Sequence, residues 1–151
     1  MKKMLLIGIG NNGRGDDGLG WAFADRLKDD ARFEVVYRYQ LQVEDAELIS
    51  QYSRVWFVDA SHQALDTGFS CERLRGQGRF NYTTHSLHPE AVLQLCHQLF
   101  QQRPETHLLG ISGVDFELGH GLSPAAGQHL DGALDFFFRM VEAEIRLSAP
   151  A

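Results

Sequence analysis

Two short, almost uninterrupted apolar runs constrain the fold of this chain more than any other feature. Residues 4–9 and residues 55–58 are apolar or glycine throughout, and polar or glycine-rich segments follow each run. Strands that are buried on both faces show such continuous runs, and they are typical of parallel sheets covered by helices. Both runs are therefore predicted to be central strands of one sheet.

Strand and helix patterns alternate along the rest of the chain. Further strands are predicted for residues 33–39, 69–74 and 106–111, and helices for residues 18–28, 44–52, 89–100 and 124–147. Ser123 and Pro124 suit the N-cap and the first position of the last helix. The alternation predicts one α/β domain over residues 1–151, a three-layer α/β/α sandwich with a mostly parallel sheet.

The composition limits the partners and the compartment. A net charge of −6 argues against nucleic-acid binding, because phosphate backbones are bound by basic surfaces. The first apolar run is too short for a signal peptide, and no stretch approaches the roughly 20 apolar residues that span a bilayer. Cys71 and Cys96 are far apart, which favours a reducing compartment over a disulfide framework. We therefore expect a cytoplasmic protein without membrane insertion.

A glycine-rich segment, residues 8–20, joins the first predicted strand to the first predicted helix. Its beginning matches the GxGxxG pattern of dinucleotide-binding proteins. In those proteins the helix begins within the glycine motif and its N-terminus faces the pyrophosphate, whereas here the helical pattern begins only after Asp17. Asp16 and Asp17 would also bring negative charge near the pyrophosphate. Nucleotide or dinucleotide binding is therefore an alternative to the main hypothesis.

Carboxylates are expected to gather at one edge of the sheet. Asp59 follows the second apolar run, and in a flavodoxin-like strand order this strand pairs with the first one. Asp59 would then meet Asp16 and Asp17 in a crevice at the carboxyl ends of the strands. Carboxylates this close repel each other, which raises a pKa or favours a bound cation. The competing interpretation of Asp16 and Asp17 is a helix cap.

A histidine completes this group. His85 precedes the third predicted helix at the same edge, with His88 as its main rival, and either could instead be a helix cap or an exposed loop residue. Two carboxylates and one imidazole suit zinc, nickel or iron and leave coordination positions open. No serine or cysteine nucleophile motif is present, so hydrolysis would use a metal-bound water.

These residues resemble the signature of the hydrogenase maturation proteases. The matching pieces, in order, are residues 10–20 (Gly-Asn-x-x-x-x-Asp-Asp-Gly-x-Gly), residues 58–60 (Val-Asp-Ala), His85 with Leu87, and residues 121–124 (Gly-Leu-Ser-Pro). The resemblance implies an α/β/α sandwich and an endopeptidase that removes the C-terminal extension of a hydrogenase large-subunit precursor. It also implies that the precursor is already loaded with nickel, so that the nickel is carried by the substrate.

The resemblance further implies roles for individual residues. The metal-contacting and catalytic positions correspond to Asp17, Asp59 and His85. The neighbouring loop residues predicted to contact substrate are Gly10, Asn11 and Asp16. A non-catalytic protein that docks on the metal-loaded precursor, like a chaperone, is a further alternative.

One segment departs from the family pattern. Many members carry Asp-Gly-Gly-Thr after the second strand, whereas residues 39–44 here are Tyr-Gln-Leu-Gln-Val-Glu. This segment is more similar to a Gln-Leu-x-Pro-Glu version found with some soluble, multisubunit hydrogenases, with Val43 in place of the proline. The departure concerns which precursor is bound, and it does not affect the three predicted ligands.

Overall fold

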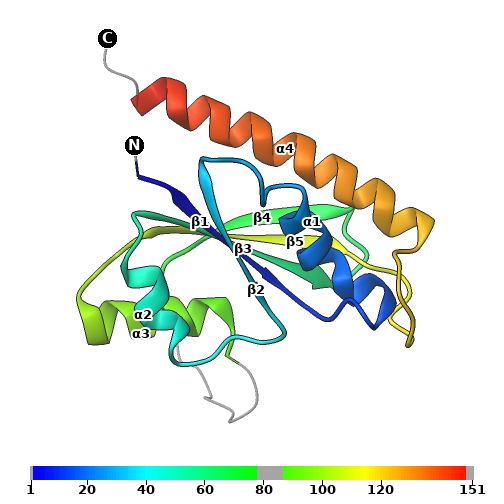
Figure 1. Ribbon diagram of the computed structural model, residues 1–151, viewed down its shortest axis with the longest axis horizontal. Helices are drawn as coiled ribbons and strands as arrows, with labels where there is room; N and C mark the ends of the chain where they lie inside the picture. The colour runs from blue at the N-terminus through cyan, green and yellow to red at the C-terminus, as the bar shows by residue number, and fades with distance from the viewer. Residues whose placement is uncertain (1, 78–86, 149–151) are drawn as a thin grey trace.

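The computed structural model of this chain describes residues 2–77 and 87–148 (Figure 1). His85, one of the predicted site residues, lies outside these ranges. The other predicted site residues all lie within them.

Five strands form one sheet. They are β1 (Met4–Ile9), β2 (Phe33–Arg38), β3 (Arg54–Ser61), β4 (Phe69–Leu74) and β5 (Glu105–Ser112). The strand order is β2-β1-β3-β5-β4, and every pairing is parallel except that of β4 with β5. The predicted pairing of the first and third strands is confirmed, with Leu5 opposite Val55. The predicted mostly parallel sheet is therefore confirmed.

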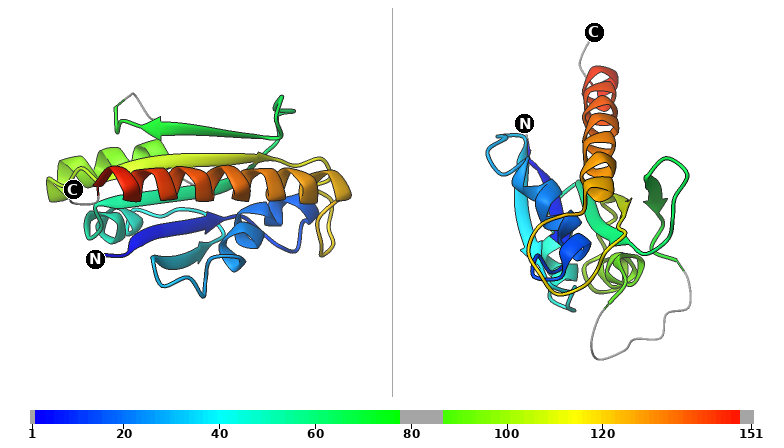
Figure 2. Two further views of the ribbon diagram at one scale, coloured as in Figure 1. Left: turned by 90° about the horizontal axis from the view of Figure 1, so that it is seen from above. Right: turned by 90° about the vertical axis from the view of Figure 1, so that its right-hand side faces the viewer.

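Helices cover both faces of this sheet. They are the 3₁₀ helix η1 (Gly15–Gly18) and the α-helices α1 (Leu19–Asp25), α2 (Asp45–Ser50), α3 (Pro89–Phe100) and α4 (Pro124–Ser148). Helices α1 and α4 pack on one face, and α2 and α3 pack on the other (Figure 2). This arrangement confirms the three-layer sandwich. None of the helices in the described part of the chain is long and apolar enough to cross a membrane.

The apolar run of β1 is continuous because each face of the strand has its own core. Leu5 and Ile7 lie in the core beneath α2 and α3, whereas Leu6 lies in the core beneath α1 and α4. Successive side chains of a strand point to opposite faces, so a strand covered on both sides is apolar at every position. The strand is therefore rigidly placed, and its carboxyl end is a firm support for the loop that follows.

The start of α4 also follows the prediction. The hydroxyl oxygen of Ser123 accepts a hydrogen bond from the backbone N–H of Ala126 at 3.2 Å, and Pro124 is the first helical residue. This is the N-cap arrangement that satisfies one of the free N–H groups of a first helical turn. The helix then crosses the sheet with one apolar face buried, and Phe137 lies at the centre of that face.

Candidate functional site

Asp17 and Asp59 line the same cavity at the carboxyl ends of the strands. The cavity has a volume of about 470 Å³, and its remaining lining residues are Ile9, Gly10, Tyr39, Gln40, Leu41, Leu87, His88 and Pro89. A second cavity of about 320 Å³ lies between the ends of β3, β4 and β5. Asp59, His88 and Pro89 line both cavities. Asp59 therefore lies where the two cavities meet.

The glycine-rich segment brings Asp17 to this position. Gly10 has a φ of +146°, and a Cβ atom there would collide with the backbone carbonyl of Asp17. That carbonyl oxygen accepts a hydrogen bond from the N–H of Asn11 at 3.1 Å. At Gly20, a Cβ atom would collide with the carbonyl oxygens of Ile9 and Val58. The glycines therefore allow the close approach of backbone segments from β1, β3 and α1.

Asn11 shapes the loop between β1 and η1. Its side-chain oxygen accepts a hydrogen bond from the N–H of Gly13 at 2.8 Å, which is an Asx turn. Its own N–H lies near Asp17 and lowers the pKa of that carboxyl. Gly10 and Asn11 thus position Asp17 through close backbone packing and a backbone hydrogen bond. Their contact with a substrate stays a prediction.

The charge of Asp17 affects the ionisation of Asp59. Burial, and then the charge of Asp17, together raise the pKa of Asp59 to about 7 against the opposing hydrogen bond of the Ala60 N–H. Burial also raises the pKa of Asp17, although the Asn11 N–H and the positive charges of His62 and Arg14 oppose that shift. Two such groups ionise together only at a cost, which a cation between them would remove. Asp59 alone is able to exchange a proton near neutral pH.

Asp16 has the opposite environment. It is completely buried, with 0% of its surface exposed. Its carboxylate accepts four hydrogen bonds, from the N–H groups of Val114, Asp115 and Ser123 and from the Ser123 hydroxyl, all between 2.7 and 2.8 Å. Burial raises its pKa, but these hydrogen bonds outweigh that effect and leave the pKa lowered. Asp16 holds the loop before α4 through these hydrogen bonds, and its contact with a substrate stays a prediction.

The helix-cap interpretation of this acidic pair is wrong. Neither η1 nor α1 has a side-chain hydrogen bond at its N-cap. Asp16 and Asp17 instead lie inside η1 and point to different surroundings, one into the protein and the other into the cavity. The two adjacent aspartates therefore have different surroundings, which the sequence pattern alone does not distinguish.

His88 caps α3 and lines both cavities. Its Nδ1 atom accepts a hydrogen bond from the N–H of Glu90 at 3.1 Å. A neutral imidazole whose Nδ1 accepts a hydrogen bond carries its proton on Nε2, so it has no free lone pair for a metal. The assignment of His85 as the imidazole ligand stays a prediction.

The segment that departs from the family pattern forms one wall of the first cavity. Asp45 holds it in place by accepting hydrogen bonds from the Arg38 Nε at 3.0 Å and from the Gln42 N–H at 2.9 Å. Tyr39 lines the cavity although 67% of its surface is exposed, and its ring lies 4.9 Å from that of Trp21. The sequence pattern did not predict Tyr39 as a site residue. Its position directly after a strand, at the carboxyl edge, was the signal available.

The structure does not favour the dinucleotide alternative. Helix α1 begins at Leu19, well after the GxGxxG match, and the η1 turn with Asp16 and Asp17 precedes it. A pyrophosphate at the N-terminus of α1 would therefore meet the carboxyl of Asp17 before it met free N–H groups. The glycines are already explained by close backbone packing.

Several solved structures that are named as hydrogenase maturation proteases have the same fold as this chain. A scan against models of protein families and a search of curated proteins give no match. Among solved structures, the hydrogenase maturating endopeptidase HybD from E. coli is 18% identical, with a TM-score of 0.71 over 97% of this chain and 94% of that one. The [NiFe] hydrogenase maturation protease HycI from Thermococcus kodakarensis is 21% identical, with a TM-score of 0.70 over 93% of each chain.

A third structure, the hydrogenase 2 maturation peptidase from a Thaumarchaeota archaeon, is 21% identical with a TM-score of 0.68, over 93% of this chain and 99% of that one. At these identities the similarity establishes the fold. The fold expected from the family resemblance is thereby confirmed over almost the whole chain.

Proposed function

We propose that this protein is an endopeptidase that removes the C-terminal extension of a nickel-loaded hydrogenase large-subunit precursor in the cytoplasm. The observation that carries the proposal is that Asp17 and Asp59 share one cavity, where the charge of Asp17 helps to raise the pKa of Asp59. The motifs around this pair resemble those of hydrogenase maturation proteases, and solved structures with that name have the same fold.

The nickel ion would come with the substrate. Asp17 and Asp59 provide two carboxylates, and the predicted third ligand is His85, a donor set that suits nickel and leaves positions for ligands from the precursor. Recognition of the bound nickel ion would allow a small protein to distinguish a nickel-loaded precursor from a nickel-free one. The other side chains of the cavity are mostly uncharged, so the carboxylates are its main electrostatic feature.

The same pair suits peptide hydrolysis. Cleavage adds the hydroxyl of water to the carbonyl carbon, breaks the C–N bond and adds a proton to the leaving nitrogen. In the metal-free protein the pKa of Asp59 is raised to about 7, so this carboxyl still carries a proton in part of the molecules at neutral pH. Binding of a cation favours the ionised carboxylate and so releases that proton within the cavity. His88 lines both cavities, and in its neutral form the Nε2–H could donate to a carbonyl oxygen of the substrate.

The test uses purified precursor in nickel-loaded and nickel-free forms. Loss of the tail is followed as a mobility shift on a denaturing gel after incubation with this protein. We expect cleavage of the loaded form only, and no cleavage of an unstructured peptide that copies the tail. Equal cleavage of both forms would contradict the nickel-dependent part of the proposal.

Substitution of Asp17 separates an enzyme from a non-catalytic docking protein. Asp17→Asn keeps the shape of the side chain and removes its charge, so it should abolish cleavage while circular dichroism shows an intact fold. Asp29→Asn, an exposed aspartate outside the cavity, is the matched control and should cleave normally. If wild-type protein binds the loaded precursor but never cleaves it, the docking alternative holds instead.

A further inference from the structure

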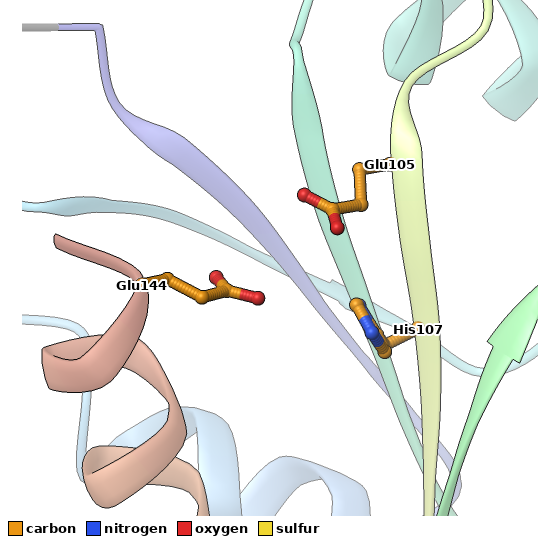
Figure 3. Close-up of side chains that lie close together, drawn as sticks. All are labelled: Glu105, His107 and Glu144. Carbon is orange, nitrogen blue, oxygen red and sulfur yellow. The ribbon is translucent and has the colours of Figure 1, made fainter. Parts of the chain in front are cut away.

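A second group of possible metal ligands lies at the other end of the sheet. Glu105 and His107 are two residues apart on β5 and therefore lie on the same face of the strand. Glu144 approaches them from the last turns of α4 (Figure 3). One ligand atom from each of the three side chains lies within 4.8 Å of the others. Glu105 pairs with Arg54 at the start of β3, whereas Asp59 lies near the carboxyl end of that strand. The group is therefore separate from the candidate active site.

His107 is the member that points to a ligand. Only 8% of its surface is exposed, and its ring stacks on that of Trp56 with centroids 4.7 Å apart. Neither ring nitrogen forms a hydrogen bond with any residue in the described ranges. The side chain projects from β5 on the side where Glu105 and Glu144 lie (Figure 3). Although the residue as a whole is buried, its unpaired ring nitrogens are not fully covered, so they are accessible to a ligand.

The protonation state of His107 fits this role. Burial lowers its pKa, and the charges of Arg73 and Arg54 lower it further against the effect of Glu105. A lowered pKa favours the neutral ring, in which one nitrogen has a free lone pair. Ligation requires that neutral form.

A guanidinium now holds the two carboxylates of this group. Arg54 Nη1 lies 3.1 Å from Glu144 Oε2, and Arg54 Nε lies 3.4 Å from Glu105 Oε2. Arg73 Nη1 lies 3.6 Å from the other oxygen of Glu105. The carboxylates are thus held near His107 by a partly exposed guanidinium, with which a small divalent cation would compete.

We propose that Glu105, His107 and Glu144 form a second binding site, for a divalent transition metal ion of the zinc type, in which the ion replaces Arg54 between the two carboxylates. One imidazole with two carboxylates suits zinc and cobalt better than magnesium or calcium, which prefer oxygen ligands alone. Zinc–ligand bonds of about 2.0–2.2 Å place tetrahedral ligand atoms about 3.4 Å apart. The three ligand atoms, which lie within 4.8 Å of one another, must therefore move closer when the ion binds. The ion would link the end of α4, through Glu144, to Glu105 and His107 on β5.

Trp56 makes this site measurable without any assay of proteolysis. The chain has two tryptophans, so Trp21→Phe leaves Trp56 as the only one. The same protein carries Asp59→Asn, which weakens metal binding in the candidate active site. Co²⁺, a paramagnetic stand-in for Zn²⁺, should quench the emission of Trp56 when it binds to the stacked ring of His107. We expect saturation at one ion per chain, recovery on addition of Zn²⁺, and no recovery with Mg²⁺.

Three further substitutions decide the outcome. His107→Gln and Glu144→Gln should each weaken Co²⁺ binding by at least about tenfold, as expected when a metal site loses a ligand. Arg54→Gln should strengthen Co²⁺ binding, because the guanidinium that competes for the two carboxylates is removed. Glu144 is partly exposed, so Glu144→Gln remains informative if the His107 variant does not fold. Quenching that is unchanged in both ligand variants would overturn the proposal, and weaker binding in Arg54→Gln would disprove replacement of the guanidinium. These results do not depend on the proposed protease activity.

Discussion

The carboxylate of Asp16 accepts two hydrogen bonds from Ser123, one from the backbone N–H and one from the hydroxyl, both at 2.7 Å. This contact joins the short helix η1 to the residue that caps α4, far along the chain. The neighbouring residue, Asp17, is thereby held with its carboxyl in the cavity that Asp59 also lines. The position of the candidate active site therefore depends on a contact that takes no part in its chemistry.

Asp16→Asn should destabilise the protein strongly. An amide offers one oxygen and brings an NH₂ donor towards N–H groups that need acceptors, so buried donors lose their partners. We expect the free energy of unfolding to fall by about 3 kcal/mol, the range for breaking a buried charged hydrogen-bond group. Urea denaturation measures this, with the exposed Asp29→Asn as the control. A change below about 1 kcal/mol, the size of a surface substitution, would contradict the assignment of Asp16 as a structural residue.

Asp16 should also make the protein sensitive to acid. Its pKa is lowered in the folded state, so it stabilises the fold at pH values above the ordinary aspartate pKa of 3.8. That stabilisation is lost as the pH falls from this value towards the lower pKa of the folded state. The difference in stability between wild type and Asp16→Asn should therefore shrink between pH 5 and pH 2, as measured by urea denaturation. A constant difference over this interval would show that charge is not the cause.

Asp59→Asn should stabilise the metal-free protein at higher pH. The pKa of Asp59 is about 7 in the folded state and near 3.8 when unfolded, so between these values the folded state binds more protons. Stability then falls as the pH rises through this interval. We expect the variant to gain about 2 kcal/mol over wild type between pH 4 and pH 8, less than the full shift implies, because Asp59 is partly exposed. Thermal unfolding at the two pH values, without metal, tests this, and an equal effect at both would be contrary to it.

The cysteines should be dispensable for cleavage. Burial raises the pKa of Cys71 and of Cys96 to about 11, so both remain thiols rather than nucleophilic thiolates at neutral pH. Cys71→Ser and Cys96→Ser should both keep cleavage activity, and native protein should react slowly with iodoacetamide at pH 7. Because Cys96 is buried, the Cys96→Ser variant is expected to be less stable than wild type. Its activity is therefore measured at a temperature at which circular dichroism shows that the variant is folded. Loss of cleavage in a folded variant would indicate covalent catalysis.

Tyr39 should contribute to substrate binding and little to stability. Its ring is largely exposed and lines the cavity, so Tyr39→Ser removes an apolar surface available to the precursor. We expect KM for the precursor to rise by about tenfold, since an aromatic contact at an interface is worth roughly 1–2 kcal/mol, with little change in kcat. Leu147→Ser, at an 88% exposed position near the end of α4, is the matched control. An equal effect of the two substitutions would exclude a specific role for Tyr39.

Local patterns were sufficient to predict the layers of the fold and the edge at which the site lies. The runs at β1 and β3 are continuous because both faces of these strands are buried, and this property is visible in the residues themselves. The cap of α4 involves only the three residues that follow Ser123. The position of Asp59 after a buried strand predicted its place at the carboxyl edge. Such features depend on neighbours in the chain, so the sequence by itself determines them.

Other features were decided only by contacts between distant residues. Asp16 and Asp17 are the same residue type and are adjacent in the chain. Only Asp16 is buried, because its carboxylate accepts hydrogen bonds from the N–H groups of Val114, Asp115 and Ser123. The placement of β4 next to β5, antiparallel to it, likewise depends on the assembled sheet. Glu105 and His107 share a face by strand periodicity, but Glu144 joins them only because α4 crosses the sheet at that point. Tertiary structure alone sets these relationships, since long-range pairing is governed by packing and by the need to satisfy buried polar groups.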